Sequence, residues 1–457
     1  MSRLGLGLEI LRAEGPRGLL ERAADRLRAA RDRAEEVRVT PGRLSRELEA
    51  GGGAPVLDVL ATPPDARFGG VPVQLEARRP DERRLRPTAL LAPEGGWWSL
   101  SAASGGRRWR ARLVRRDVPE SPIGASRRGV AAILEAVRLV GARIVNVEGA
   151  SGWPPHALLP LAAGPAKLVL SLHDFALYCP RPNLVEEPYA RFCGYSRDGE
   201  RCRACLTASW DLTPGFVERW REDSTTLLSA ADAVVYPSGF LRGAHARLFP
   251  AATPRREAVF APAPPAGPPP ERRIAGTSDV PRIAFVGAYR PHKGALVFEE
   301  LVRTGLAADE PRPRWTILGS GDPVLLLRAR RAGAAVAGHY RAGSLASRLI
   351  AERVDVALLL SIWPETYSLT LTECRQAGVP VVAFDHGAIA ERVREAGGGD
   401  LVPLERGAAG IAEALARRLA GTRPVPEPRS EVEPGAERRR AAGERNALYR
   451  TLLSEPS

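Results

Sequence analysis

The feature that most constrains the fold of this chain is a repeated pattern, in which a short apolar run gives way to a polar loop and then to a helix-forming segment. The clearest case is VDVALLL at 354–360, followed by SIWPETYSLTLTE at 361–373. A continuous apolar run of this length is typical of a strand buried on both faces of a parallel sheet. Residues 369–377 are predicted to form the following helix.

Two carboxylates, Glu365 and Glu373, lie eight residues apart in this stretch. Glu365 is expected in the loop at the carboxyl end of the strand, and Glu373 in the helix. Ligands of open α/β sheets bind at that edge, and a helix N-terminus offers N–H groups to an anion. The two carboxylates would then accept hydrogen bonds from hydroxyls, for example those of a ribose and a sugar. The alternative is two solvated glutamates at an ordinary helix start, where carboxylates are common.

Length and charge bound the class of protein. At 457 residues, 44% of them hydrophobic, the chain is predicted to form about two to three globular domains. Its net charge of +13 comes almost wholly from arginine, because Lys167 and Lys293 are its two lysines. A basic chain suits an anionic partner such as a nucleotide, a phospholipid surface or a nucleic acid, and charge alone does not choose among them.

The N-terminal residues 1–40 are predicted to be helical, because apolar residues recur at three- and four-residue spacing with arginines between them. This helix either packs on the body of the protein or lies on an anionic membrane surface. A transmembrane helix needs about 18 consecutive apolar residues, and no apolar run in the sequence approaches that length. No signal-peptide pattern is found. The expected location is the cytoplasm, with peripheral contact at the inner face of the membrane as an option.

The α/β pattern runs through the chain twice, on either side of a proline-rich stretch. Apolar runs predict strands at 56–62, 88–92, 107–114, 143–148, 167–172, 231–238 and 257–261, and then at 283–287, 315–321, 336–340, 354–360 and 378–383. The expected organisation is a helical leader at 1–50, an α/β domain at 51–261, a linker at 262–280, a second α/β domain at 281–425, and a tail with a final helix at 426–457.

A second candidate edge follows the predicted strand 167–172, where His173 and Asp174 begin a loop. A histidine at the carboxyl end of a strand is a candidate for ligand contact, and a purely structural role remains open.

Four cysteines fall within an insert of the first domain, 179–205. Their spacing is C-x13-C-x8-C-x2-C, and they are Cys179, Cys193, Cys202 and Cys205. Because cytoplasmic proteins rarely keep disulfides, this cluster predicts a structural zinc site. The first gap is irregular and no second C-x2-C is present, so reduced, packed thiols are an equal alternative, and redox use is a lesser one. Cys374 is expected to be a small buried residue.

The loop from Gly287 to Gly294, GAYRPHKG, joins a predicted strand to a predicted helix. A glycine-bounded basic loop at a helix N-terminus is an arrangement that holds phosphates through backbone N–H groups and a cationic side chain. Lys293 and Arg290 are the candidate charges. The spacing fits neither a Walker P-loop nor G-x-G-x-x-G.

Five motifs, in order, resemble the family 4 glycosyltransferases. Glu365 to Glu373 matches the E-x7-E motif of that family, and GAYRPHKG resembles its G-x-x-x-P-x-K-G loop. LSLHDFALYCPRPNL is similar to the H-D-x-x-x-x-C-P-R segment of bacterial members. AADAVVYPSGF and FGGVPVQL resemble two further elements, and the likeness spans roughly 54–420.

The resemblance implies a GT-B fold, in which two doubly wound Rossmann-like domains flank a cleft. It implies a retaining transfer from a nucleotide-diphosphate sugar to a saccharide or lipid-linked saccharide, of the type used in cell-surface polysaccharide synthesis, with no metal required for catalysis. Carried over by position, the implied catalytic residues are Glu365, His173 and Lys293; the donor-binding residues are Glu373, Arg290, Gly287, Gly294, Tyr367, Ser368 and Leu369; and the acceptor-side loop contains Gly69 and Gly70.

One position departs from the family pattern. Many members carry arginine directly after the first glycine of the phosphate loop, where this chain has Ala288, so Arg290 would have to substitute. That departure keeps open a non-catalytic GT-B scaffold that binds a nucleotide or a partner glycosyltransferase. A sugar-nucleotide epimerase lacks identifiable acid and base residues. Nucleic-acid binding rests on charge alone, without a recognition motif, and no nucleic-acid partner is expected.

Overall fold

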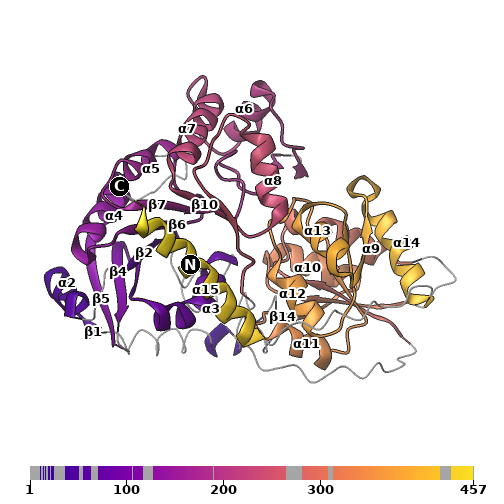
Figure 1. Cartoon of the computed structure of the whole chain (residues 1–457). Helices are drawn as coiled ribbons and strands as arrows, with labels where there is room; N and C mark the ends of the chain where they lie inside the picture. Colours follow the sequence, from indigo (N-terminus) through magenta and orange to yellow (C-terminus); the bar gives the residue numbers. More distant parts are fainter. Residues whose placement is uncertain are drawn as a thin grey trace. The chain divides into compact units, whose positions relative to one another are not determined.

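The computed structural model describes residues 37–50, 55–62, 70–104, 107–116, 127–188, 190–263, 280–306, 312–421 and 434–455, with scattered positions between 11 and 24 (Figure 1). The chain forms two compact units. The C-terminal unit contains 264–434 with 1–29 and 190–192, and the N-terminal unit contains 30–189, 193–263 and 435–457.

The C-terminal unit is built on a six-stranded, wholly parallel sheet in the order β14-β13-β12-β15-β16-β17. Its strands are β12 (Arg282–Val286), β13 (Arg314–Leu318), β14 (Ala335–Gly338), β15 (Val356–Leu359), β16 (Val381–Phe384) and β17 (Gly399–Val402). Its helices are α9 (Ala295–Thr304), α10 (Pro323–Ala332), α11 (Leu345–Ala351), α12 (Leu369–Gln376), α13 (Gly387–Ala396) and α14 (Gly407–Leu419), with short 3-10 turns η1 (Pro291–Lys293) and η2 (Leu404–Arg406).

Helices cover both faces of this sheet, which explains why most residues of its strands are apolar. Alternate residues of a strand point to opposite faces. In β12, Phe285 packs in a core with Phe298 of α9 and residues of α10 and α14, whereas Ala284 packs in a second core with Leu371 of α12 and residues of α11 and α13. The unit is therefore a doubly wound α/β domain.

The N-terminal unit carries a nine-stranded mixed sheet in the order β1-β5-β4-β3-β2-β6-β7-β10-β11. Its strands are β1 (Val37–Arg38), β2 (Val56–Val59), β3 (Thr88–Glu94), β4 (Trp97–Ser104), β5 (Arg107–Arg115), β6 (Ile144–Glu148), β7 (Lys167–Ser171), β10 (Ala233–Tyr236) and β11 (Glu257–Val259). The pairs β3–β4 and β4–β5 are antiparallel, and the other pairs are parallel.

Helices surround this sheet as well (Figure 1). They are α2 (Pro41–Ala50), α3 (Gly70–Leu85), α4 (Arg127–Val140), α5 (Pro155–Ala162), α6 (Gly199–Thr207), α7 (Phe216–Ala230) and α8 (Gly239–Leu248). A short two-stranded sheet, β8 (Val185–Glu186) with β9 (Arg191–Phe192), precedes α6.

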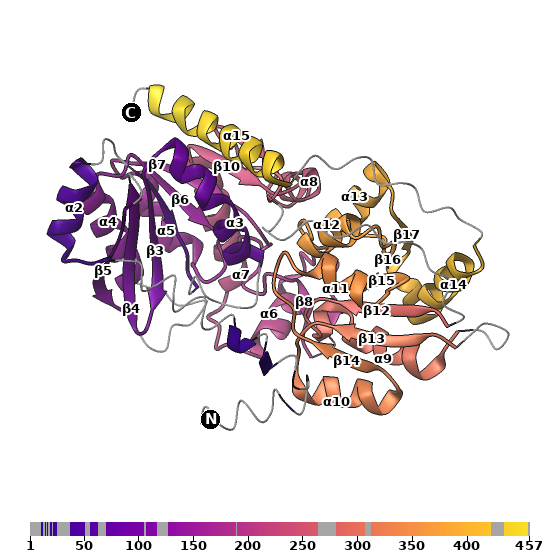
Figure 2. The ribbon, with the colours of Figure 1, turned by 90° about the horizontal axis from the view of Figure 1, so that it is seen from below.

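The final helix, α15 (Pro434–Ser454), packs on the N-terminal sheet although it follows the C-terminal unit in sequence (Figure 2). Its Tyr449 and Leu452 are buried in one core with Val56 of β2 and Ile144 of β6. The tail helix expected from the sequence is therefore part of the N-terminal core.

Two expectations need correction. Strand β4, WWSLSAAS, was not predicted, because its small polar residues hide the apolar face that Trp98, Leu100 and Ala102 bury. Within the predicted N-terminal helix, Val37–Arg38 instead form an edge strand parallel to β5. The described residues do not include most of the remaining leader, the glycine run 51–53 or linker residues 264–279. Among the described helices, none combines the length and apolarity needed to cross a membrane.

Candidate functional site: two sheet edges with charged residues

Adjacent parallel strands bring the first set of predicted residues together in the C-terminal unit. β12 and β15 pair directly, so the loops after them emerge at the same edge of the sheet. Gly294 (φ +87) shows how closely these loops pack, because a Cβ atom there would lie 2.0 Å from the carbonyl oxygen of Leu360. Only glycine combines this backbone angle with this approach.

Lys293 and Glu365 form an ion pair at this edge, with 2.7 Å between Nζ and Oε1. The hydroxyl of Ser361 donates to the same carboxylate oxygen, and the Lys293 ammonium lies 5.2 Å from the centre of the Trp363 ring. Burial alone would raise the pKa of Glu365, but the Lys293 charge and the hydrogen bonds from Lys293 and Ser361 outweigh it and lower that pKa. Glu365 is therefore ionised at neutral pH.

The backbone of the basic loop differs from the sequence expectation. The N–H groups of Lys293 and Gly294 donate to the carbonyls of Arg290 and Pro291, and the N–H of Ala295 donates to Arg290. The loop thus satisfies these amides itself, and a phosphate would meet the side chains first. Gly287 (φ +116) has open space where a Cβ would lie, and Arg290 is exposed.

Glu373 occupies a different environment from Glu365. It is 2% exposed, and its Oε2 accepts a hydrogen bond of 2.9 Å from the N–H of Leu345, with further backbone donors at Gly343 and Ala346. Burial raises the pKa of Glu373 to about 7, although these backbone hydrogen bonds oppose the rise. In this structure Glu373 anchors the turn before α11.

The turn between the two glutamates is held in an uncommon conformation. Ser368 has φ +75, unusual for a residue with a side chain, and its hydroxyl accepts from the N–H of Leu371 at the start of α12. Arg392 donates to the carbonyls of Tyr367 and Ser368 at 3.1 and 2.8 Å and stacks on the Tyr367 ring. Sequence reasoning missed Arg392, since only folding brings α13 beside this turn.

The N-terminal unit has its own charged edge, at His173. Nε2 of His173 lies 3.0 Å from Oε2 of Glu148, which ends the neighbouring strand β6. Burial would raise the pKa of Glu148, but Arg78, the hydrogen bond to His173 and Arg445 hold it well below its usual range. A charged carboxylate therefore fixes the orientation of the His173 ring.

Behind Glu148 lies a buried polar cluster. Arg78 of α3 contacts Glu148, Asp58 and Glu82, and all four side chains are at most 5% exposed. Arg445 of α15 donates to the hydroxyl of Ser171 at 3.0 Å and lies 4.0 Å from both Glu82 and Glu148. Asn146 donates to Asp58 at 2.9 Å and also to Glu148. The sequence signals for this cluster are Glu148 at the end of an apolar run, and Asp58 and Asn146 as polar residues inside apolar runs.

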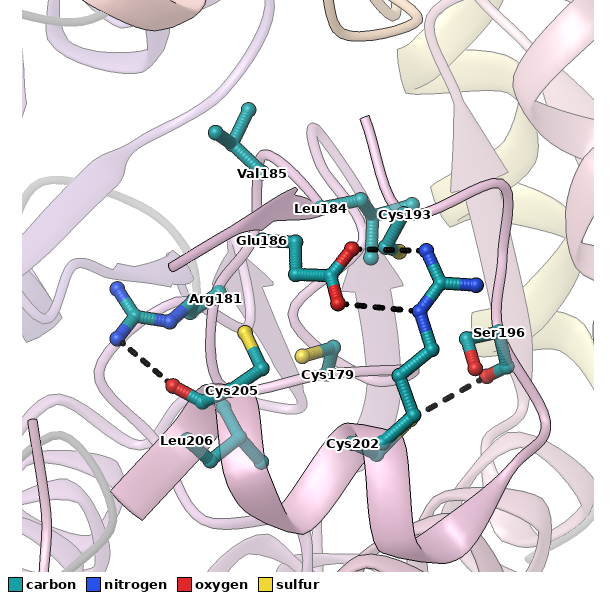
Figure 3. Close-up of a pocket in the computed structure, with 11 residues that line it drawn as sticks. Cys179, Arg181, Leu184, Val185, Glu186, Cys193, Ser196, Cys202, Cys205 and Leu206 are labelled. Atoms are coloured by element: carbon teal, nitrogen blue, oxygen red, sulfur yellow. Dashed lines mark hydrogen bonds and ion pairs between the residues drawn. The ribbon is translucent and has the colours of Figure 1, made fainter. Parts of the chain in front are cut away.

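The remaining predicted residues fall elsewhere. Gly70 is the first residue of α3, and Gly69 lies outside the described residues. The four cysteines of the insert line one pocket in the N-terminal unit (Figure 3).

The fold and these edges can now be compared with known proteins. Residues 280–420 match the sequence family described as "Glycosyl transferases group 1". No curated protein sequence matches the chain.

Solved structures give a broader match. Sucrose-phosphate synthase from Thermosynechococcus elongatus superposes with a TM-score of 0.60 at 17% identity, covering 88% of this chain and 100% of its own. The catalytic domain of starch synthase IV from Arabidopsis thaliana, bound to ADP and acarbose, gives 0.53 at 12% identity, with 88% and 100% covered. An Anabaena protein in complex with UDP gives 0.52 at 13% identity, again with 88% and 100% covered.

These comparisons confirm the predicted α/β fold, with two Rossmann-like domains of the GT-B type. Together with the family match of residues 280–420, they support a glycosyltransferase.

Proposed function

We propose that this protein is a retaining glycosyltransferase that moves a sugar from a nucleotide-diphosphate donor to a saccharide or lipid-linked saccharide, in the synthesis of a cell-surface polysaccharide. The observation that carries the donor part is the Lys293–Glu365 pair at the carboxyl edge of β12 and β15. The polysaccharide role, the lipid-linked acceptor and peripheral contact with the inner membrane face rest on the sequence resemblance.

Lys293 is proposed to bind the diphosphate. Without a ligand its ammonium is paired with Glu365 at 27% side-chain exposure, so an incoming anion can reach it and share its charge. Charge on the diphosphate grows as the glycosidic bond breaks, and a fixed cation lowers the energy of that state most. Arg290 is proposed to add a second positive charge in place of the arginine absent at Ala288.

The other predicted residues are proposed to orient the donor. Glu365, released in part from Lys293, would accept hydrogen bonds from sugar hydroxyls. Glu373, on the first two turns of α12, would accept them from the ribose. Tyr367, Ser368 and Leu369 would present the start of α12 to the phosphates, because a helix N-terminus favours anions. In the N-terminal unit, His173 is proposed to contact the sugar, and Gly69 and Gly70 to let backbone approach the acceptor.

The test is thermal shift of the full chain with UDP, GDP, ADP and dTDP, followed by transfer assays with the matching sugars. A ligand that binds only the native state raises Tm. Lys293→Ala should lose the shift and the activity, whereas Lys167→Ala, which removes the other lysine, should keep both. If a nucleotide raised the Tm of Lys293→Ala as much as that of the wild type, the result would contradict the proposed role of Lys293.

The alternative is a non-catalytic scaffold, which the Ala288 departure favours. It predicts a nucleotide shift with no transfer and no hydrolysis of any nucleotide sugar. In that case Ala288→Arg would be the informative variant, because it restores the family pattern.

A further inference from the structure

We infer that the cysteine-rich insert of the N-terminal unit is a structural zinc site, with Cys179, Cys193, Cys202 and Cys205 as its four ligands. This inference does not depend on sugar transfer. The chain has five cysteines, and four of them line one pocket, contributed by the loop after β7, the residue after β9 and helix α6 (Figure 3). None of the four is in a disulfide.

The four cysteines lie close together in this pocket. In Figure 3 the sulfur atom of Cys179 points toward Cys205. On α6, Cys202 and Cys205 are three residues apart, a spacing that places both side chains on one face of the helix.

Backbone N–H groups point at these sulfur atoms. The N–H of Arg181 donates to Cys179, and those of Tyr195 and Ser196 donate to Cys193. The N–H of Glu187 donates to Sγ of Cys205 at 3.3 Å. Such donors stabilise a thiolate, which is the form that binds metal.

Cations surround the pocket as well. Nη2 of Arg221 lies 3.5 Å from Sγ of Cys202, and Arg181 and Arg201 are among the lining residues. Arg201 is paired with Glu186. A zinc ion bound by four thiolates carries a net charge of about −2, which nearby guanidinium groups offset.

The insert also needs a stabilising element of this kind. Its β8 and β9 strands have two residues each, and α6 has nine. Among the described residues from 179 to 206, the buried apolar ones are Pro180, Leu184, Val185 and Leu206. Segments with so little apolar core are commonly held by disulfides or a metal ion.

The four cysteines are free thiols in this structure. No three His, Cys, Asp or Glu side chains in the described part of the chain already have the separations that a metal ion requires. Binding must therefore release protons from the four thiols and draw the sulfur atoms to about 2.3 Å from the ion.

The first experiment measures metal in the full chain, purified without chelators and then stripped and refilled with Zn²⁺ or Co²⁺. We expect about one zinc ion per chain and, with Co²⁺, the intense charge-transfer bands of a tetrahedral thiolate site. Cys374→Ser, at a cysteine buried in the C-terminal unit, should leave both unchanged, and Cys205→Ser should lose the four-thiolate spectrum. A wild-type chain that holds no zinc and gives no thiolate bands with Co²⁺ would overturn the inference.

A second measurement does not depend on whether Cys205→Ser folds. In the wild type, removal of zinc should lower Tm and expose four thiols to a thiol reagent, and added Zn²⁺ should reverse both effects. Thiol reactivity that is the same with and without Zn²⁺ would overturn the inference. A measured mass of the chain that is lower by two hydrogens per cysteine pair would indicate a disulfide, and this result would also overturn the inference.

Discussion

Glu148 and His173 end adjacent parallel strands of the N-terminal sheet, and their side chains meet at 3.0 Å. The His173 side chain is 10% exposed and that of Glu148 1%, so the carboxylate is the more deeply buried partner of the ring. Arg78 and Arg445 keep that carboxylate charged. If His173 contacts the sugar, Glu148 is the residue that positions it.

Glu148→Gln should therefore lower both activity and stability. Loss of the charge leaves the buried Arg78 with one partner fewer, which typically destabilises by about 3 kcal/mol or more. The misplaced His173 should lower kcat by about 10-fold to 100-fold. His173→Ala should lower kcat with little change in Tm, because its ring lies at the edge of the cluster. If the fold-loss of kcat in the double variant equalled the product of the losses in the two single variants, Glu148 would not act through His173.

Gly294→Ala should destabilise the C-terminal unit strongly. The new Cβ would lie 2.0 Å from the carbonyl oxygen of Leu360, at a backbone angle of φ +87. Strain and overpacking together should cost about 2 to 5 kcal/mol. The matched control is Gly95→Ala, at φ +54 with nothing within 4 Å, which should cost about 1 to 2 kcal/mol. Equal shifts in denaturation midpoint for the two variants would contradict the close approach of the two loops.

Glu373 should make the protein less stable as pH rises from about 5 to 7. Burial raises its pKa from 4.5 to about 7 in the folded chain, so the folded state holds a proton that the unfolded state releases. Stability falls with pH wherever the folded state binds more protons, by up to about 3 kcal/mol here. The measurement is Tm against pH for the wild type and Glu373→Gln. The difference between the two curves should change across this window, and parallel curves would rule out the raised pKa.

Leu452→Ala should destabilise the N-terminal unit although it lies at the far end of the sequence. Leu452 is 0% exposed, in one core with Tyr449 and Val56. Truncation of a buried leucine typically costs about 2 to 5 kcal/mol. Arg450→Ala, two residues away on the exposed side of α15, is the control and should have little effect. Fluorescence-monitored denaturation of the full chain measures both.

The sequence by itself determined the class of fold and most of the apolar parallel strands, but not β1, β4, β8, β9 or β17. Parallel strands buried on both faces must be continuously apolar, so runs such as 282–286 and 356–359 stand out from the loops between them. It also located the loops that carry Lys293, Glu365 and His173, because each of these loops directly follows an apolar run. The roles of these residues remain predictions.

Only the tertiary structure decided which loops meet. Lys293 and Glu365 are 72 residues apart, and they pair because β12 and β15 are neighbours in the sheet order. Arg392, Arg445 and Glu148 came from helices or strands whose neighbours no local pattern specifies. The same holds for α15, whose apolar residues predicted a helix without predicting the sheet that covers them. Local periodicity encodes which face of an element is buried, whereas its partner depends on how the whole chain packs.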